Sequence, residues 1–169
     1  TFTLGANLST ATLAIDSGNL STSNRTLTVT NALELLRGGG NLTLGSALTT
    51  LNGGLVLSGS VLTGGAGTLD VNGSLAFSTG SLIAPSGTMT VSGNFTMSGG
   101  TLDSNGGTVT LDGSSDQGLR LPGTSSTEDF ATLRINKSAG SVILGSAISG
   151  ALVQLSAGTL TQGSNIVTT

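Results

Sequence analysis

Residues 68–113 read TLDVNGSLAFSTGSLIAPSG (68–87), TMTVSGNFTMSGGTLDSNGG (88–107) and TVTLDG (108–113), which is two lines of twenty residues and the start of a third. Apolar residues fall in the same columns of successive lines, whereas Thr, Ser, Asp and Asn lie between them. This alternation is typical of strands that bury one face. Gly or Asn-Gly interrupts each line where a corner needs a left-handed backbone. The stretch therefore predicts three short strands in every twenty residues.

One phrase of this pattern recurs along the chain, with apolar residues at its first, third and eighth positions. Its copies lie at 13–20, 55–62 (LVLSGSVL), 75–82 (LAFSTGSL), 95–102 (FTMSGGTL) and 153–160, with looser copies at 33–42 and 133–142. A constant period near twenty residues indicates that each strand pairs with its equivalent one turn later. We therefore predict an all-β fold, a right-handed parallel β-solenoid (β-helix) with about 20 residues per turn, in which residues 1–169 form a single domain.

Two alternatives accompany this prediction. An antiparallel sandwich also uses short alternating strands, but it does not require a period of twenty residues. Residues 31–37 fit a short helix, although the columns of the repeat favour a strand there. In the solenoid, the residues expected to point inward are Leu75, Phe77, Leu82, Phe95, Met97 and Leu102. Those expected to point outward are Thr68, Thr88, Thr90 and Thr108.

The composition limits the chemistry of the chain. It contains no Cys and no His, which nearly all nucleophilic triads and transition-metal sites require. Five basic and eight acidic residues give a net charge of −3 without a basic stripe, so nucleic acid is not an expected partner. The apolar runs are too short to span a bilayer. We therefore expect no catalytic residue, no metal, no cofactor and no enzymatic activity.

Residues 112–132 break the pattern and are interpreted as an irregular insertion. Insertions in a solenoid are extruded as loops on one side, which is often the binding side, although loops also gather charge simply because charge is solvated there. The alternative function is a carbohydrate-binding or carbohydrate-cleaving β-helix that uses residues 112–137. Cleavage needs carboxylates that converge on the scissile bond, and only this segment could gather them, because no acidic residue of the regular turns stacks on another. The candidate binding residues are Asp112, Asp116, Arg120, Glu128, Asp129, Arg134 and Lys137.

The two ends of the predicted coil suggest self-assembly. A terminal turn exposes unpaired backbone groups unless a cap, water or another chain satisfies them. The first and last segments alternate, are rich in β-formers and carry no charged side chain, and the whole chain has only 8% charged residues and a mean hydropathy of +0.32. We expect a homopolymer joined end to end or edge to edge. The assembly edges are Thr1, Phe2, Thr3, Leu4, Ile166, Val167, Thr168 and Thr169.

Two weaker patterns indicate other ligands. Thr-x-Thr occurs at 88–90 and 108–110 and places threonines above one another on an outer face, as an ice-binding ladder does, but threonine also suits any exposed strand. Residues 64–70 are similar to the calcium-binding nonapeptide, yet the aspartate is one position late and the unit does not recur.

Residues 107–160 resemble a repeat that is common in very large secreted bacterial surface proteins. In that repeat a Gly-Thr-Val-Thr strand and a loop precede an aromatic-led Asn-Leu-x-Ile-Asn-Lys-Ser stretch. The matching positions here are Phe130, Leu133, Ile135, Asn136, Lys137 and Ser138, whereas Ala131 and Thr132 depart from the pattern. The remainder looks like adhesin-type β-helix repeats. The resemblance implies a secreted structural or adhesive role, with no catalytic residues to transfer. We therefore expect an extracellular, cell-surface protein of a filament, sheath or adhesin, and we name surface glycans as a second class of partner.

Overall fold

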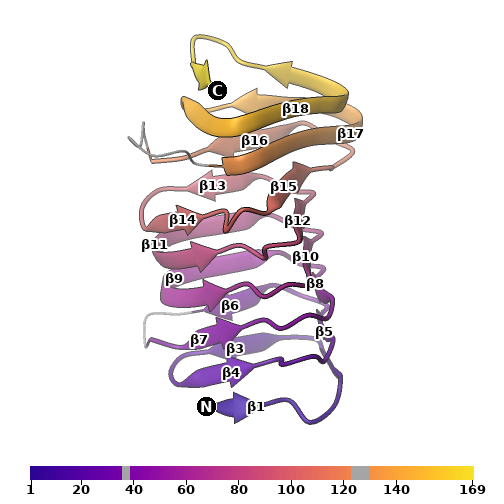
Figure 1. The fold of residues 1–169 in the computed structure, drawn as a ribbon, viewed down its shortest axis with the longest axis vertical. Coiled ribbons are helices and arrows are strands. Elements are labelled where there is room, and N and C mark those ends of the chain that lie inside the picture. Colours follow the sequence, from indigo (N-terminus) through magenta and orange to yellow (C-terminus); the bar gives the residue numbers. More distant parts are fainter. Residues whose placement is uncertain (36–38, 123–129) are drawn as a thin grey trace.

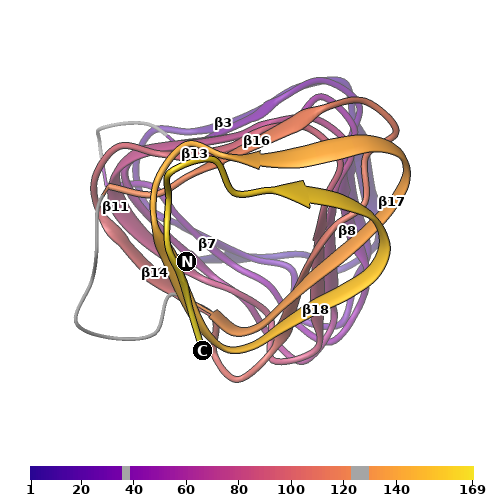
Figure 2. The ribbon, with the colours of Figure 1, turned by 90° about the horizontal axis from the view of Figure 1, so that it is seen from above.

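The structure, a computed structural model, describes residues 1–35, 39–122 and 130–169. These residues form an all-β solenoid of about eight turns, in which parallel strands stack about 20 residues apart. Figure 1 shows the turns stacked along the long axis, with the N-terminus and C-terminus at opposite ends. Seen from the C-terminal end in Figure 2, the chain runs counter-clockwise as it approaches the viewer, so the coil is right-handed. The predicted fold is confirmed.

The strands lie on three sides, which we name faces A, B and C. Face A contains β1 (Phe2–Thr3), β4 (Asn19–Ser21), β7 (Asn41–Thr43), β14 (Thr101–Asp103) and β19 (Val167–Thr168). Face B contains β2 (Leu8–Thr10), β5 (Leu27–Val29), β8 (Thr49–Leu51), β10 (Thr68–Val71), β12 (Thr88–Val91) and β15 (Thr108–Leu111). Face C contains β3 (Leu13–Ile15), β6 (Leu33–Leu35), β13 (Phe95–Met97) and β16 (Gln117–Arg120).

Four longer strands bend around a corner. β9 (Leu55–Thr63) and β11 (Leu75–Ile83) run from face C to face A, and β17 (Phe130–Leu144) runs from face B to face C. β18 (Ile148–Thr161) begins on face A, where Ile148 and Ser149 pair with β19, and then follows β17 across faces B and C. Each bend contains a glycine with positive φ, which a residue with a Cβ adopts only with strain. These glycines are Gly59, Gly80, Gly140 and Gly158.

A continuous apolar core fills the space between the three faces. Leu75 pairs with Phe95 in the next turn, and both side chains are fully buried. The rings of Phe95 and Phe130 pack edge to face, with centroids 6.2 Å apart. The predicted inward residues are confirmed as core, except that Leu102 is only partly buried against it. The predicted outward threonines are half-buried on face B.

Two copies of the repeated phrase lie one face away from where the sequence alignment placed them. Leu133, which begins the copy at 133–142, pairs with Val109 on face B rather than continuing the face C column, and the copy at 153–160 follows it. The correction has a simple cause. The phrase encodes a strand, a glycine bend and a strand, and such a unit fits any corner of the coil, so the phrase alone does not identify the corner.

The segment interpreted as an insertion contains a regular strand. β16 pairs with β13 and β17, and Leu119 is fully buried opposite Phe95, a register step of 24 residues. Residues 123–129, which include the candidate residues Glu128 and Asp129, lie outside the described residues.

At residues 31–37, β6 (Leu33–Leu35) confirms the strand interpretation over the helical one up to Leu35, and residues 36–38 lie outside the described residues. The described chain forms no helix of the length and apolarity that crossing a membrane requires.

Candidate functional site

The charged residues proposed as one binding set are divided among different parts of the coil. Arg134 lies on face B and donates from Nε to Ser156 Oγ, 3.0 Å away. Arg120 is exposed on face C. The remaining described members lie at the corner between faces B and C: Asp112, Asp116 and Lys137. The structure therefore assigns only this corner as a cluster of candidate residues.

A buried polar column occupies the inside of that corner. Lys137 is 2% exposed, and its Nζ donates to Gln117 Oε1 of the preceding turn over 3.1 Å. Gln117 is 1% exposed, and its Nε2 donates to the carbonyl oxygens of Val91, at 2.7 Å, and Gly93 one turn further back. These contacts satisfy the carboxamide and fix its orientation within the core. Lys137 is thus part of the interior, although the sequence interpretation placed it among solvated loop charges.

Burial lowers the pKa of Lys137 below its ordinary value, because desolvation disfavours the ammonium form. The carboxylates of Asp116 and Asp112 act in the opposite direction and favour the charged amine. Asp116 is exposed and accepts from the backbone N–H of Ser141 at 2.9 Å. Asp112 is half-buried and accepts from Ser92 Oγ at 2.8 Å. The corner therefore places the amine inside the coil and two carboxylates on its outer side.

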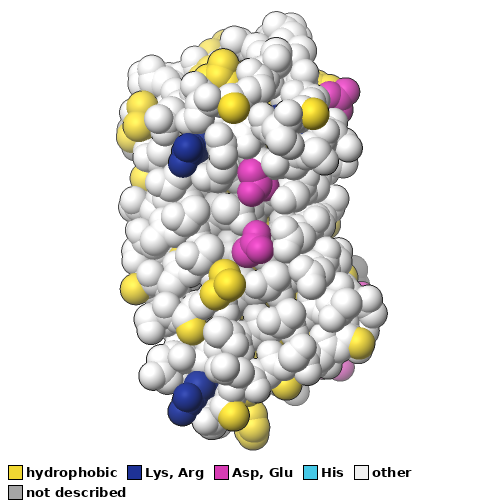
Figure 3. All heavy atoms as spheres, turned by 90° about the vertical axis from the view of Figure 1, so that its right-hand side faces the viewer, with side chains coloured by type: hydrophobic (Ala, Val, Ile, Leu, Met, Phe, Trp, Pro, Cys, Tyr) yellow, Lys and Arg dark blue, Asp and Glu magenta, His cyan; other side chains and the backbone are white. Residues whose placement is uncertain are grey.

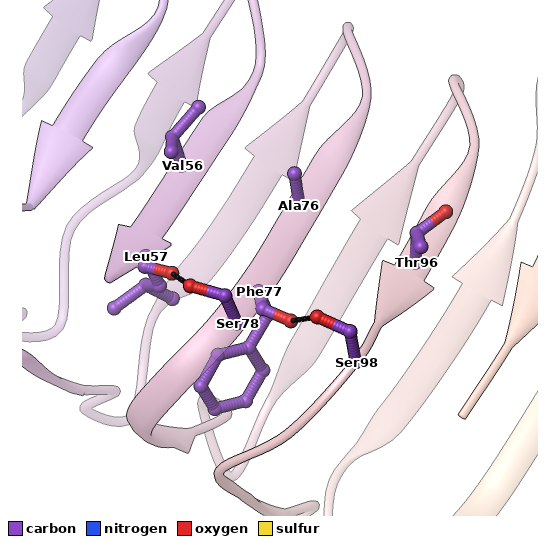
Figure 4. A pocket seen from close by; sticks show the side chains of 7 residues that line it. All are labelled: Val56, Leu57, Ala76, Phe77, Ser78, Thr96 and Ser98. Carbon is purple, nitrogen blue, oxygen red and sulfur yellow. Dashed lines mark hydrogen bonds between the residues drawn. The ribbon is translucent and has the colours of Figure 1, made fainter. Parts of the chain in front are cut away.

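Face C carries shallow hollows along the rod. The central one, drawn in Figure 4, is lined by Val56, Leu57, Ala76, Phe77, Ser78, Thr96 and Ser98. Figure 4 shows the hydroxyls of Ser78 and Ser98 donating to backbone carbonyls, over 3.4 and 3.5 Å. Small and apolar groups therefore dominate this surface, whereas small-molecule sites add several converging polar groups that fix a ligand. Arg120 lines a second hollow of the same face, together with Pro122.

Face B carries a threonine ladder that is longer than the sequence pattern suggested. Its members, aligned by strand pairing, are Thr28, Thr50, Thr68, Thr88, Thr90, Thr108, Thr110 and Thr132. Figure 3 shows this side as mostly uncharged, with isolated acidic and basic side chains. Two charges interrupt the ladder: Asp70 accepts from Thr90 Oγ1 at 2.6 Å, and Arg134 lies above Thr110.

The first turn leaves one edge of β1, β2 and β3 unpaired, because these strands pair only with the second turn in the described chain. Phe2 is 67% exposed, and its neighbours Thr1 and Thr3 are exposed as well. Leu4 is buried, and its N–H donates to the Ser21 carbonyl at 2.9 Å. Three of the four predicted edge residues at this end are therefore accessible.

The last turn is similarly open. Leu155 lies in the inward column above Ile135 but is 57% exposed, since no described turn covers it. Ile166 is 63% exposed, and Val167 is half-buried where it pairs with Ile148. Thr168 and Thr169 are exposed. An apolar slice of the core therefore meets solvent at this end.

Sequence reasoning missed Gln117 as a member of the corner cluster. The sequence did contain a pattern that predicts its burial. Gln117 lies two residues before Leu119 and four before Leu121, both of which are buried, and alternate residues of a strand point to the same side. Lys137 likewise lies two residues after the buried Ile135, so the same alternation predicts that it points inward. Following the alternation through the supposed loop would have placed both side chains inside.

Metal ligands do not cluster in the described residues, where no group of three or more His, Cys, Asp or Glu side chains could hold an ion. Comparison of the chain with protein-family models, with curated proteins and with solved structures found no match.

Proposed function

We propose that this chain is a non-enzymatic structural protein, an extracellular β-solenoid subunit that assembles with copies of itself into a surface filament, sheath or adhesin. The observation that carries the proposal is the match between the two open ends. The first turn presents one unpaired strand on each face, namely β1, β2 and β3. The last turn presents β19 on face A and the two halves of β18 on faces B and C.

Head-to-tail stacking covers both ends. The chain direction around the coil is the same in every turn, so a second copy added in this way continues the parallel pairing on faces B and C, where its β2 and β3 follow β18. On face A, β19 of one copy and β1 of the next would occupy the same level, so one of these two short strands must give way to the other. The end strands contain no charged side chain, so no ion is desolvated when they meet. Backbone hydrogen bonds and the covering of apolar side chains would then stabilise the contact.

The chemical character of the chain supports the same role. A continuous core stiffens the rod, and the low charge of its surface defends it poorly against association. The extracellular setting rests on the resemblance of residues 107–160 to repeats of secreted bacterial surface proteins.

Two lysine substitutions on β18 test the assembly. Leu155 and Leu152 are 57% and 51% exposed in a single copy, so Leu155→Lys and Leu152→Lys should both fold. Leu155 points into the core column above Ile135, whereas Leu152 lies in the outward column above Thr132. Stacking therefore buries residue 155 but leaves residue 152 at the surface. Leu155→Lys should weaken association by at least about 100-fold, because burying an unpaired charge costs several kcal/mol.

Sedimentation velocity over a range of concentrations, with electron microscopy of the largest species, measures the effect. The native chain and Leu152→Lys should form rods, and moderate salt should weaken them little because the contact is uncharged. A native chain that stays monomeric at high concentration contradicts the proposal. So does a Leu155→Lys variant that assembles as the native chain does.

The length of the threonine ladder favours ice binding as a second candidate function. Equivalent hydroxyls and methyls repeat at the strand spacing of about 4.8 Å, so face B presents a regular lattice to water. The interruptions by Asp70 and Arg134 rank this candidate below assembly. Inhibition of ice recrystallisation by the native chain, lost in Thr88→Lys and retained when Thr43→Lys alters face A, would support ice binding.

A further inference from the structure

Lys137 is the only lysine of the chain, and its amine is buried against a carboxamide rather than exposed to solvent. Nζ lies 3.1 Å from Gln117 Oε1, which places the amine nitrogen beside the carbonyl group of that side chain. Both side chains are at most 2% exposed, so water is largely excluded from the contact. A nucleophile and an acyl group are thus held together without a competing solvent nucleophile.

The carboxamide is also held in one orientation. Gln117 Nε2 donates to the carbonyls of Val91 and Gly93, which fixes the nitrogen side away from Lys137 and the oxygen side towards it. Asp116 and Asp112 act electrostatically on the amine from the outer side of the corner. An amine and a carboxamide are therefore in contact at this corner, and two carboxylates are close enough to act electrostatically on the amine.

We propose that Lys137 and Gln117 form an intramolecular isopeptide bond that joins two successive turns of the coil. The ammonium first gives one proton to a neighbouring carboxylate or to solvent. The neutral Nζ then attacks Cδ of Gln117, a bond forms between Nζ and Cδ, and the bond between Cδ and Nε2 breaks. The leaving nitrogen takes the proton that Nζ loses and departs as ammonia. No oxidant, reductant or cofactor takes part, and the products are a secondary amide and one molecule of ammonia.

Mass spectrometry of the intact, incubated protein tests the bond directly. The native chain should be lighter than its sequence predicts by the mass of one ammonia. Peptide mapping should find a branched peptide that joins the segments containing Gln117 and Lys137. An amine-reactive reagent applied after unfolding should label only the N-terminal amine, since the chain has no other lysine.

Lys137→Arg is the matched control, because it keeps a cation and a hydrogen-bond donor but has no amine that forms this amide. Its mass should equal that of its sequence. The peptide map of the native chain gives an independent answer even if this variant folds poorly. A native chain of full sequence mass after incubation, with Lys137 labelled on unfolding, overturns the proposal.

Discussion

Thr49→Val should make the protein more stable, which is unusual for a substitution in a packed core. Thr49 lies in the inward column of face B between Leu27 and Leu69, and it is 1% exposed. Its Oγ1 is buried without a hydrogen-bond partner in the described part of the chain. An unpaired buried hydroxyl is unfavourable by about 1–3 kcal/mol, and valine has nearly the same shape with a methyl in its place. We expect a gain of about 1–2 kcal/mol in the free energy of unfolding.

Denaturant unfolding followed by far-ultraviolet circular dichroism measures this gain, and the melting temperature should rise by roughly 2–8 °C. Thr50→Val is the matched control, because Thr50 is the next residue of β8 and points outward from face B. Its effect should stay within about 0.5 kcal/mol. If Thr49→Val lowers the stability instead, the hydroxyl is hydrated by a buried water and the reasoning about its isolation is wrong.

Three further predictions concern the core, a bend and the buried amine. Phe95→Ala should lower the free energy of unfolding by about 3–5 kcal/mol, because it leaves a cavity beside Leu75, whereas Thr96→Ala on the same strand should change it little; thermal unfolding compares them. Gly80→Ala should lower the melting temperature clearly, since a Cβ there would lie 2.1 Å from the Ser60 carbonyl at a φ of +99°. The rate of ammonia loss should fall about tenfold for each pH unit below the lowered pKa of Lys137, because only the neutral amine attacks; mass spectra at timed intervals measure it.

The regular columns made most of the fold predictable from the sequence. Leu75 and Phe95 repeat at the period of the coil, so their pairing follows from spacing alone. The corner at which each copy of the repeated phrase lies was less predictable. The same Ser-x-Gly sequence forms the bend between faces C and A at Gly80 and the bend between faces B and C at Gly140. The corner occupied by residues 133–142 becomes clear only from the pairing of Leu133 with Val109 on face B.

The candidate corner was predictable in part. Asp112 and Asp116 were identified by their charge, and both carboxylates act electrostatically on the Lys137 amine in the fold. The contact between Lys137 and Gln117 was missed, because a charged or amide side chain within a polar stretch is ordinarily solvated. Its burial depends on the turn before and the turn after, which the local sequence does not specify.

The stacking of the turns determines how this rod would respond to force. Each turn contacts mainly its two neighbours, and the hydrogen bonds between turns run along the axis of the rod. Tension applied at the two ends would therefore load these bonds a few at a time and peel off one turn after another, starting from an open end. A covalent tie between Gln117 and Lys137 would stop peeling that starts at the C-terminal end once it reached Lys137, and it would hold the two joined turns together when peeling starts at the other end.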